Sequence, residues 1–187
     1  MIIRLATDKI QSDSIVDGEG IRSVIWTQGC IHNCLGCHNP ETHSFQNGIS
    51  LDVEMVKKKI SQLEGQDGVT FSGGDPMEQP EACAELAKYC KSLGLNVWCY
   101  TGYTFEELLK KKEFIPAIME FLKYIDVLVD GRFILSKKSY DVVFRGSSNQ
   151  RLIDVAKSLE NDTVIEIKKY DNDSIDEAHS MKKYLYI

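Results

Sequence analysis

An apolar run leads directly into three cysteines in the stretch Ser23-Val24-Ile25-Trp26-Thr27-Gln28-Gly29-Cys30-Ile31-His32-Asn33-Cys34-Leu35-Gly36-Cys37-His38-Asn39. Residues 23–27 are typical of a buried strand. The cysteines follow with the spacing C-x3-C-x2-C, and three thiolates on such a loop can each hold one iron of a cubane cluster. The fourth iron then lacks a protein ligand and is open to a small molecule. The stretch therefore predicts an enzyme.

The same cysteines have two simpler interpretations. A structural zinc site of the Cys3His type would take His32 or His38 as its fourth ligand. However, structural zinc sites usually draw their ligands from two separated pairs, and here every candidate lies within nine residues. The spacing favours iron–sulfur over zinc and leaves free or redox-active thiols as a further alternative. A plain electron carrier is the remaining function class for a cluster protein.

The composition and charge of the chain argue against several classes of protein. The chain has 187 residues, 43% hydrophobic residues and a net charge of −6. These values predict one domain over residues 1–187, with a polar tail from about residue 171, and argue against nucleic-acid binding. No stretch approaches the roughly 18 apolar residues of a membrane span, and no export signal is recognisable. Clustered cysteines without such a signal predict a cytoplasmic protein with metal-bound thiolates.

Strand and helix patterns alternate along the chain. The expected strands are 23–27, 68–72, 95–100, 125–130 and 163–167, with 142–144 as a candidate; the expected helices are 51–63, 79–93, one from 104, 115–123 and 149–159. Such alternation predicts an α/β fold with a parallel sheet wrapped by helices. An eight-fold barrel usually needs about 250 residues. We therefore expect an incomplete, open barrel.

Local signals support several helix ends. Thr104 and Glu107 fit a capping box, and Pro116 suits a first helical turn. Gly94 is a candidate C-terminal cap, and Ser50 or Asp52 a candidate N-terminal cap.

Two further motifs follow predicted strands. Ser72-Gly73-Gly74-Asp75-Pro76 contains glycines that let a backbone approach a ligand closely, although a simple turn is the alternative. Asp130-Gly131-Arg132 offers an arginine that can bind a carboxylate, or a plain surface pair. Ligands of α/β proteins bind at the carboxyl ends of strands, where the cysteine loop also lies. The cysteine loop and the Ser72–Pro76 turn should therefore open toward one mouth.

The remaining cysteines and aromatic residues have simpler roles. Cys83, Cys90 and Cys99 are predicted core residues, since free cysteine is commonly buried. The same expectation holds for Trp26 and Trp98, which lie in strand patterns. Tyr100 and Tyr103 lie near the predicted mouth and are candidates for its lining.

These motifs resemble those of a known family. The cysteine motif resembles that of radical S-adenosylmethionine (SAM) enzymes, and Asp17-Gly18-Glu19-Gly20-Ile21-Arg22 resembles an N-terminal motif of glycyl-radical-enzyme activases. Segments 100–108, 129–133 and 144–151 are similar to the activases of anaerobic ribonucleoside-triphosphate reductase. The resemblance spans residues 10–155. An activase of the pyruvate formate-lyase type is the nearest alternative.

The resemblance implies an open (β/α)6-type radical-SAM barrel and a defined reaction. A [4Fe–4S] cluster would reductively cleave SAM to methionine and a 5′-deoxyadenosyl radical. That radical would take a hydrogen from a glycine of the partner, anaerobic ribonucleoside-triphosphate reductase. The electron donor would be flavodoxin or a similar low-potential carrier. The cofactors carry the chemistry, and no side chain is expected to be catalytic in itself.

The resemblance also implies roles for individual residues. The cluster ligands would be Cys30, Cys34 and Cys37, and the SAM-binding residues would be Gly36, His38, Ser72, Gly73, Gly74, Asp75, Asp130 and Arg132. Within this set, Asp75 replaces a more common glutamate and Arg132 replaces a lysine. Glu19 also stands where a proline is common, which alters the expected shape of that loop.

Overall fold

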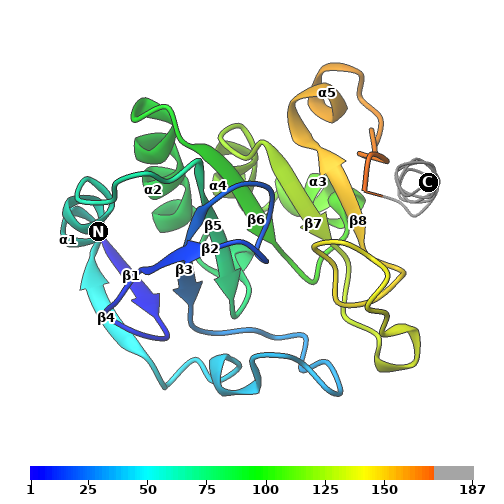
Figure 1. Cartoon of the computed structure of the whole chain (residues 1–187), viewed down its shortest axis with the longest axis horizontal. Coiled ribbons are helices and arrows are strands. Elements are labelled where there is room, and N and C mark those ends of the chain that lie inside the picture. The colour runs from blue at the N-terminus through cyan, green and yellow to red at the C-terminus, as the bar shows by residue number, and fades with distance from the viewer. Residues whose placement is uncertain (171–187) are drawn as a thin grey trace, which may run out of the picture.

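Four parallel strands form the centre of one mixed sheet in the computed structural model, which describes residues 1–170 (Figure 1). They are β3 (Arg22–Thr27), β5 (Gly68–Gly73), β6 (Asn96–Tyr100) and β7 (Val127–Asp130). Antiparallel strands flank them: β1 (Ile2–Leu5), β2 (Gln11–Ser14), β4 (Ile49–Asp52) and β8 (Arg151–Asp154). The order is β4-β1-β3-β5-β6-β7-β8, and β2 pairs with β3. The predicted α/β class is confirmed.

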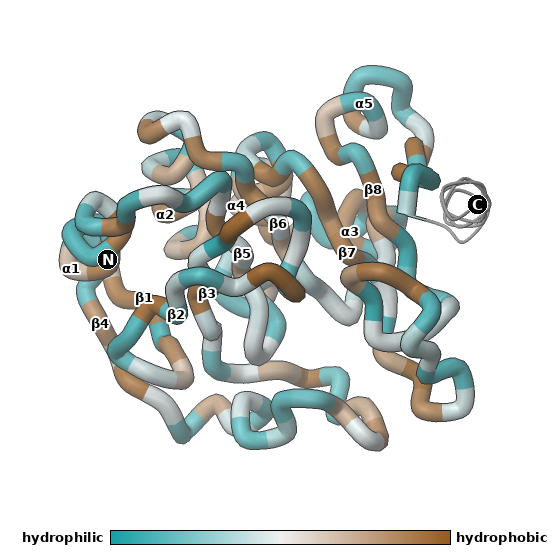
Figure 2. Tube along the Cα trace, in the orientation of Figure 1, coloured by the Kyte–Doolittle hydropathy of each residue, from teal (hydrophilic) through white to brown (hydrophobic). Residues whose placement is uncertain are grey.

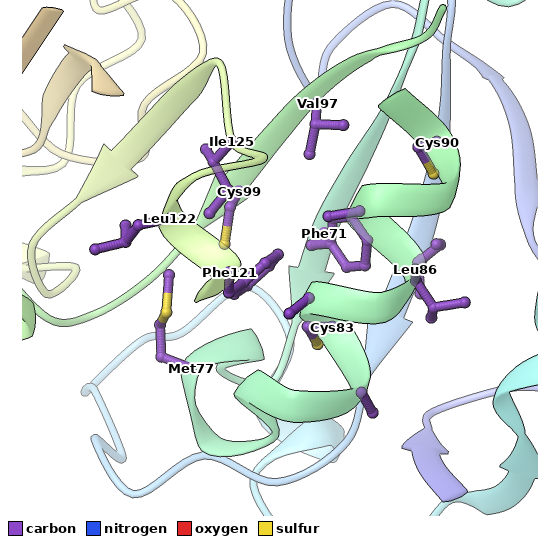
Figure 3. Packing of buried hydrophobic residues seen from close by; sticks show 14 of the residues in the cluster. Phe71, Met77, Cys83, Leu86, Cys90, Val97, Cys99, Phe121, Leu122 and Ile125 are labelled. Atoms are coloured by element: carbon purple, nitrogen blue, oxygen red, sulfur yellow. The ribbon is translucent and has the colours of Figure 1, made fainter. Parts of the chain in front are cut away.

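Helices connect these strands and cover the sheet. They are α1 (Val53–Ile60), α2 (Pro80–Ser92), α3 (Phe105–Lys111), α4 (Pro116–Leu122) and α5 (Val155–Glu160), with short 3-10 turns η1 (Pro40–Thr42), η2 (Pro76–Glu78) and η3 (Leu135–Lys137). Figure 3 shows α2 and α4 packing against β5 and β6, with Phe71 and Phe121 in edge contact. Burial of these apolar side chains is the main stabilising contribution to the fold.

The opposite face of the sheet carries a smaller apolar cluster. Strand residues alternate between faces, so Trp98 points away from the main core and packs with Val127, Val129 and Leu152. Figure 2 shows that hydrophobic segments concentrate on the central strands, and that the loop after β2 is also strongly hydrophobic. No helix among residues 1–170 is long and apolar enough to cross a membrane.

The predicted cap residues are confirmed, although the helix predicted over 51–63 is shorter and spans Val53–Ile60. The Thr104 side chain accepts from the Glu107 backbone N–H, and the Glu107 side chain accepts from the Thr104 backbone N–H. Asp52 rather than Ser50 caps α1, with its carboxylate 2.8 Å from the Glu54 nitrogen. Gly94 follows α2 at φ +77°, a conformation that costs glycine little.

Several predicted elements are wrong. The sheet is mixed rather than parallel, because β1, β2 and β4 add antiparallel strands that their short, partly polar sequences did not indicate. Residues 142–144 form turns, and 163–167 contribute a single bridge rather than a strand. The predicted helix 149–159 begins as β8, since pairing with β7 overrides its helical pattern. The predicted tail from residue 171 lies outside the described residues.

Candidate metal centre

A cavity of about 660 Å³ opens at the carboxyl ends of β3, β5 and β6. Its lining includes Cys30, Cys34 and Cys37 from the loop after β3, and Ser72, Gly73, Gly74 and Asp75 from the turn after β5. The structure thus brings the two predicted motifs to one mouth. The parallel pairing of β3 with β5 causes this, because both strands end at the same edge.

Backbone hydrogen bonds join the cysteine loop to the turn. The Gly74 nitrogen donates to the Thr27 oxygen at 2.8 Å, and the Asp75 nitrogen donates to the Gly29 oxygen at 2.9 Å. A Cβ atom on Gly74 would lie 2.4 Å from that same Gly29 oxygen. Glycine is therefore required at position 74 by a close approach of two backbones.

The loop surrounds its sulfur atoms with burial and backbone donors. Burial raises the pKa of the Cys30 thiol to about 11, while backbone N–H groups of His32 and Asn33 act in the opposite direction. Burial also raises the pKa of Cys34. The Asn39 nitrogen lies 3.4 Å from the Cys37 sulfur. Soft thiols with N–H donors fit an iron–sulfur cluster, because a bound metal keeps the thiolates deprotonated and the N–H groups stabilise their charge.

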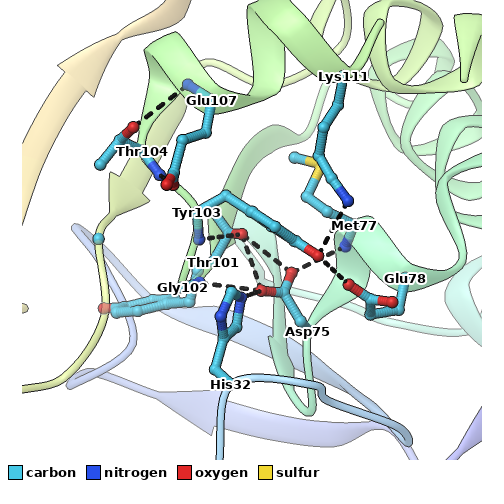
Figure 4. Close-up of polar contacts among 12 residues, drawn as sticks. His32, Asp75, Met77, Glu78, Thr101, Gly102, Tyr103, Thr104, Glu107 and Lys111 are labelled. Carbon is cyan, nitrogen blue, oxygen red and sulfur yellow. Dashed lines mark hydrogen bonds and ion pairs between the residues drawn. The ribbon is translucent and has the colours of Figure 1, made fainter. Parts of the chain in front are cut away.

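The Asp75 carboxylate forms the centre of a buried polar network beneath this loop (Figure 4). One oxygen lies 2.8 Å from His32 Nε2, and the carboxylate also accepts from Thr101 Oγ1 at 2.9 Å, Gly102 N at 2.9 Å and Met77 N at 3.0 Å. The side chains of His32 and Asp75 are 2% and 1% exposed. One carboxylate therefore ties together the cysteine loop, the turn after β5 and the loop after β6.

A second set of contacts extends this network toward α3. The Tyr103 ring packs edge-on against His32 at a centroid distance of 4.5 Å. Its hydroxyl donates to Glu78 at 2.5 Å and accepts from Lys111 Nζ at 3.1 Å. Burial and the neighbouring Glu78 raise the pKa of the Tyr103 hydroxyl. Tyr103 therefore supports the cysteine loop from below and is absent from the cavity lining, whereas Tyr100 lines it.

Comparisons with known proteins agree with this geometry. Residues 16–153 match the family described as a 4Fe-4S single cluster domain. The chain is 34% identical to the anaerobic ribonucleoside-triphosphate reductase-activating protein of Haemophilus influenzae, over 73% of this chain and 89% of the relative. The proteins of that name from phage T4 and Escherichia coli are 34% and 33% identical, over 78% and 73% of this chain and 91% and 90% of each relative.

The chain belongs to the family of anaerobic ribonucleoside-triphosphate reductase-activating proteins. The family match to a 4Fe-4S domain favours the iron–sulfur interpretation over zinc. His32 Nε2 is engaged by Asp75, and the His38 ring packs on Phe133 at 5.0 Å.

The predicted SAM-binding residues divide into two groups in this family member. Ser72, Gly73, Gly74, Asp75 and His38 line the cavity, and Gly36 lies beside it in the cysteine loop. The side chains of Asp130 and Arg132 are absent from the lining. The buried Asp130 carboxylate instead accepts from the Phe105 nitrogen at 2.8 Å and from Arg151 Nε at 3.0 Å.

The sequence did not predict several other residues of the cavity lining. Trp26, a predicted core residue, is half-buried, lines the cavity and donates from its indole to Gln11 at 3.0 Å. Its strand position gave no sign of this, since both faces of β3 carry apolar residues. Phe144 and Arg145 also line the cavity, in a segment whose only sequence signal was the family resemblance. Trp98 is buried as predicted.

Proposed function

We propose that this protein activates anaerobic ribonucleoside-triphosphate reductase by forming a glycyl radical on it. The observation that carries the proposal is one cavity lined by three cysteines and by the turn Ser72–Asp75, in a chain of the activating-protein family. The bound cluster and SAM would supply the chemistry: one-electron cleavage of SAM to a 5′-deoxyadenosyl radical, which takes a hydrogen atom from a glycine of the reductase.

The chain's own residues would hold and enclose these cofactors. Cys30, Cys34 and Cys37 are the proposed cluster ligands, and the three of them leave one iron for SAM. The turn at Gly73 and Gly74 is proposed to hold the SAM amino group through its backbone, because the Asp75 carboxylate is engaged within the protein. Gly36, His38 and Ser72 are the remaining residues of this region that we propose to contact SAM.

For Asp130 and Arg132 we propose an indirect role in SAM binding. Their sequence motif suggests contact with SAM, but the Asp130 side chain binds Arg151 and the amino end of α3. Gly131, between them, lines the cavity. We therefore propose that this segment meets SAM through its backbone at Gly131, with Asp130 holding the backbone in position and Arg132 acting only through its charge.

The same proposal includes the type of barrel, the cellular compartment and the electron donor. The sheet order runs from β4 to β8 without pairing of these two edge strands among residues 1–170, which suits an open (β/α)6-type radical-SAM barrel in a single domain. A reducing cytoplasm and a low-potential donor such as flavodoxin match the needs of half-buried thiolates and a reducible cluster.

Anaerobic reconstitution tests the proposal. The protein is loaded with iron and sulfide, reduced with dithionite and given SAM, and 5′-deoxyadenosine is assayed while the cluster is followed by electron paramagnetic resonance (EPR). We expect product and a signal that changes on adding SAM. Addition of the reductase should then give a glycyl radical signal. A cluster indifferent to SAM would contradict the proposal, and iron-free protein with one zinc per chain would restore the zinc interpretation.

A further inference from the structure

The long loop between β7 and β8 forms one wall of the cavity. Asp130 and Arg151 pair at the base of this loop, so residues 131–150 leave the sheet and return to it. Gly131 and Gly146 of the loop line the cavity. A connection longer than about 15 residues is uncommon in a compact domain and usually has a function. What holds this wall in shape therefore bears on what the cavity can bind.

The side-chain amide of Gln150 joins two parts of this loop. Its Oε1 atom accepts from the Gly146 nitrogen at 2.8 Å and from the Ser147 nitrogen at 3.2 Å, and its Nε2 atom donates to the Gly131 oxygen at 3.0 Å. The opposite orientation of the amide would set its NH2 group against two N–H donors, so these contacts fix which end is which. Gln150 itself is half-buried and lines the cavity.

The two backbones that Gln150 joins belong to different sides of the cavity wall. Gly131 directly follows β7 and adopts a φ of +92°. Gly146 lies against the cysteine loop, where a Cβ atom on it would be 2.9 Å from His38 Cε1. Gly131 and His38 are both proposed contacts of SAM. The Gln150 amide therefore fixes the spacing between two parts of the proposed SAM site.

We propose that Gln150 is a positioning residue for SAM, which acts through the backbones of Gly131 and Gly146. This inference rests on the proposed function. With its amide bonded to both backbones, the wall is already ordered when SAM arrives. Without these bonds the wall has to be ordered during binding, and the conformational entropy lost in that step weakens the affinity.

Two variants of the full, reconstituted protein test the proposal. Gln150→Met keeps the length of the side chain and removes all three hydrogen bonds. Gln150→Glu is the conservative variant, because its carboxylate still accepts from the Gly146 and Ser147 nitrogens but no longer donates to Gly131.

Gln66→Met is the matched control. Gln66 is also a half-buried glutamine whose amide joins distant segments, through Ser23 Oγ at 3.0 Å and Asp13 Oδ1 at 2.9 Å, and it does not line the cavity. Gln66→Met and Gln150→Met should therefore lower the urea midpoint of unfolding by similar amounts. A role of Gln150 in stability alone would give the two variants the same effect on SAM as well.

Two measurements separate positioning from stability. The Kd for SAM is measured per bound cluster without a reductant, so that SAM is not cleaved and a change in iron loading is counted separately. Hydrogen exchange of the amides in residues 131–150 is measured with and without SAM. In Gln150→Met these amides should exchange faster than in the wild type, and adding SAM should slow them more than it does in the wild type.

We expect Gln150→Met to weaken SAM binding about tenfold, Gln150→Glu to recover part of that loss, and Gln66→Met to stay within about twofold of the wild type. The proposal is wrong if both Gln150 variants bind SAM within about twofold of the wild type, or if Gln66→Met weakens binding as much as Gln150→Met. Exchange in residues 131–150 of Gln150→Met that does not respond to SAM would also reject it. A wild-type protein that carries its cluster but does not bind SAM would instead reject the proposed function.

Discussion

The six cysteines of this protein lie in two regions with opposite surroundings. Cys30, Cys34 and Cys37 are half-buried around an open cavity, with backbone N–H groups near their sulfur atoms. Cys83, Cys90 and Cys99 are fully buried between α2 and the sheet, as predicted (Figure 3). Burial raises the pKa of Cys90 to about 12 and raises those of Cys83 and Cys99 as well. The same residue type thus serves as a proposed metal ligand in one region and as a small apolar residue in the other.

The difference between the regions comes from backbone geometry. The first three cysteines follow a strand end, where the chain turns through positive φ at Asn33 and Gly36 and exposes its polar groups. The others lie in a helix and a strand whose backbone groups are already hydrogen-bonded. A thiolate is stable only where donors or a metal compensate its charge. In the loop, backbone N–H groups of His32 and Asn33 oppose the effect of burial on Cys30, and a backbone N–H group lies near Cys37.

Replacing a loop cysteine should have the largest effect, because these cysteines are the ones proposed to bind the cluster. Cys30→Ala, Cys34→Ala and Cys37→Ala should each abolish cluster binding and SAM cleavage, because each removes one of the three proposed protein ligands of the cluster. Iron content, EPR and 5′-deoxyadenosine formation measure this effect. A variant that keeps its cluster and its cleavage activity would remove that cysteine from the ligand set.

The His32–Asp75 contact tests how far the loop depends on the structure beneath it. His32→Leu should lower iron affinity by about tenfold, a typical cost of losing a partner that positions ligands. His32→Gln, which can still donate to Asp75, should recover most of that loss and of the SAM-induced EPR change. Equal behaviour of the two variants would show that the hydrogen bond is not what positions the loop.

Replacing a core cysteine should have the opposite outcome, with a loss of stability and no change at the metal centre. Cys83→Ala should cost about 1 kcal/mol of unfolding free energy, since it removes one buried sulfur from a packed helix. Urea denaturation measures this loss. Iron content and the EPR spectrum should equal those of the wild type. Loss of iron in this variant would mean that the core and the metal centre are not separate regions.

The smallest effect is expected at an exposed ion pair outside both regions. The Arg151 guanidinium lowers the pKa of Glu106 to about 2. This pair therefore contributes stability above pH about 4.5 and loses it as the pH falls toward 2. The Glu106 side chain is half exposed, so Glu106→Gln should cost less than about 1 kcal/mol at pH 7. Urea denaturation across pH measures the difference in unfolding free energy between Glu106→Gln and the wild type, and this difference should vanish on acidification. A difference that grows on acidification would contradict the stabilising role of the ionised Glu106 carboxylate.

Much of the fold was predictable because it rests on local rules. The capping box at Thr104, the helix Pro80–Ser92 and the four central strands follow from residue patterns within one element. The antiparallel strands were not predictable, since residues 2–5 and 49–52 are short and become a strand pair only by meeting each other. Strand pairing over such sequence distances depends on the whole chain.

The sequence by itself determined the cysteine motif and the turn after β5, because residue spacing within a loop is a local property. Their common edge was predicted from the alternation of strands and helices, and it is produced by the parallel pairing of β3 with β5. Tertiary structure alone decided how these parts are held. Asp75 was predicted to face SAM, yet its carboxylate binds His32, Thr101 and Gly102 from two other loops. Asp130 likewise binds Arg151. A buried carboxylate takes whichever donors the fold brings within reach, and no sequence motif states which those are.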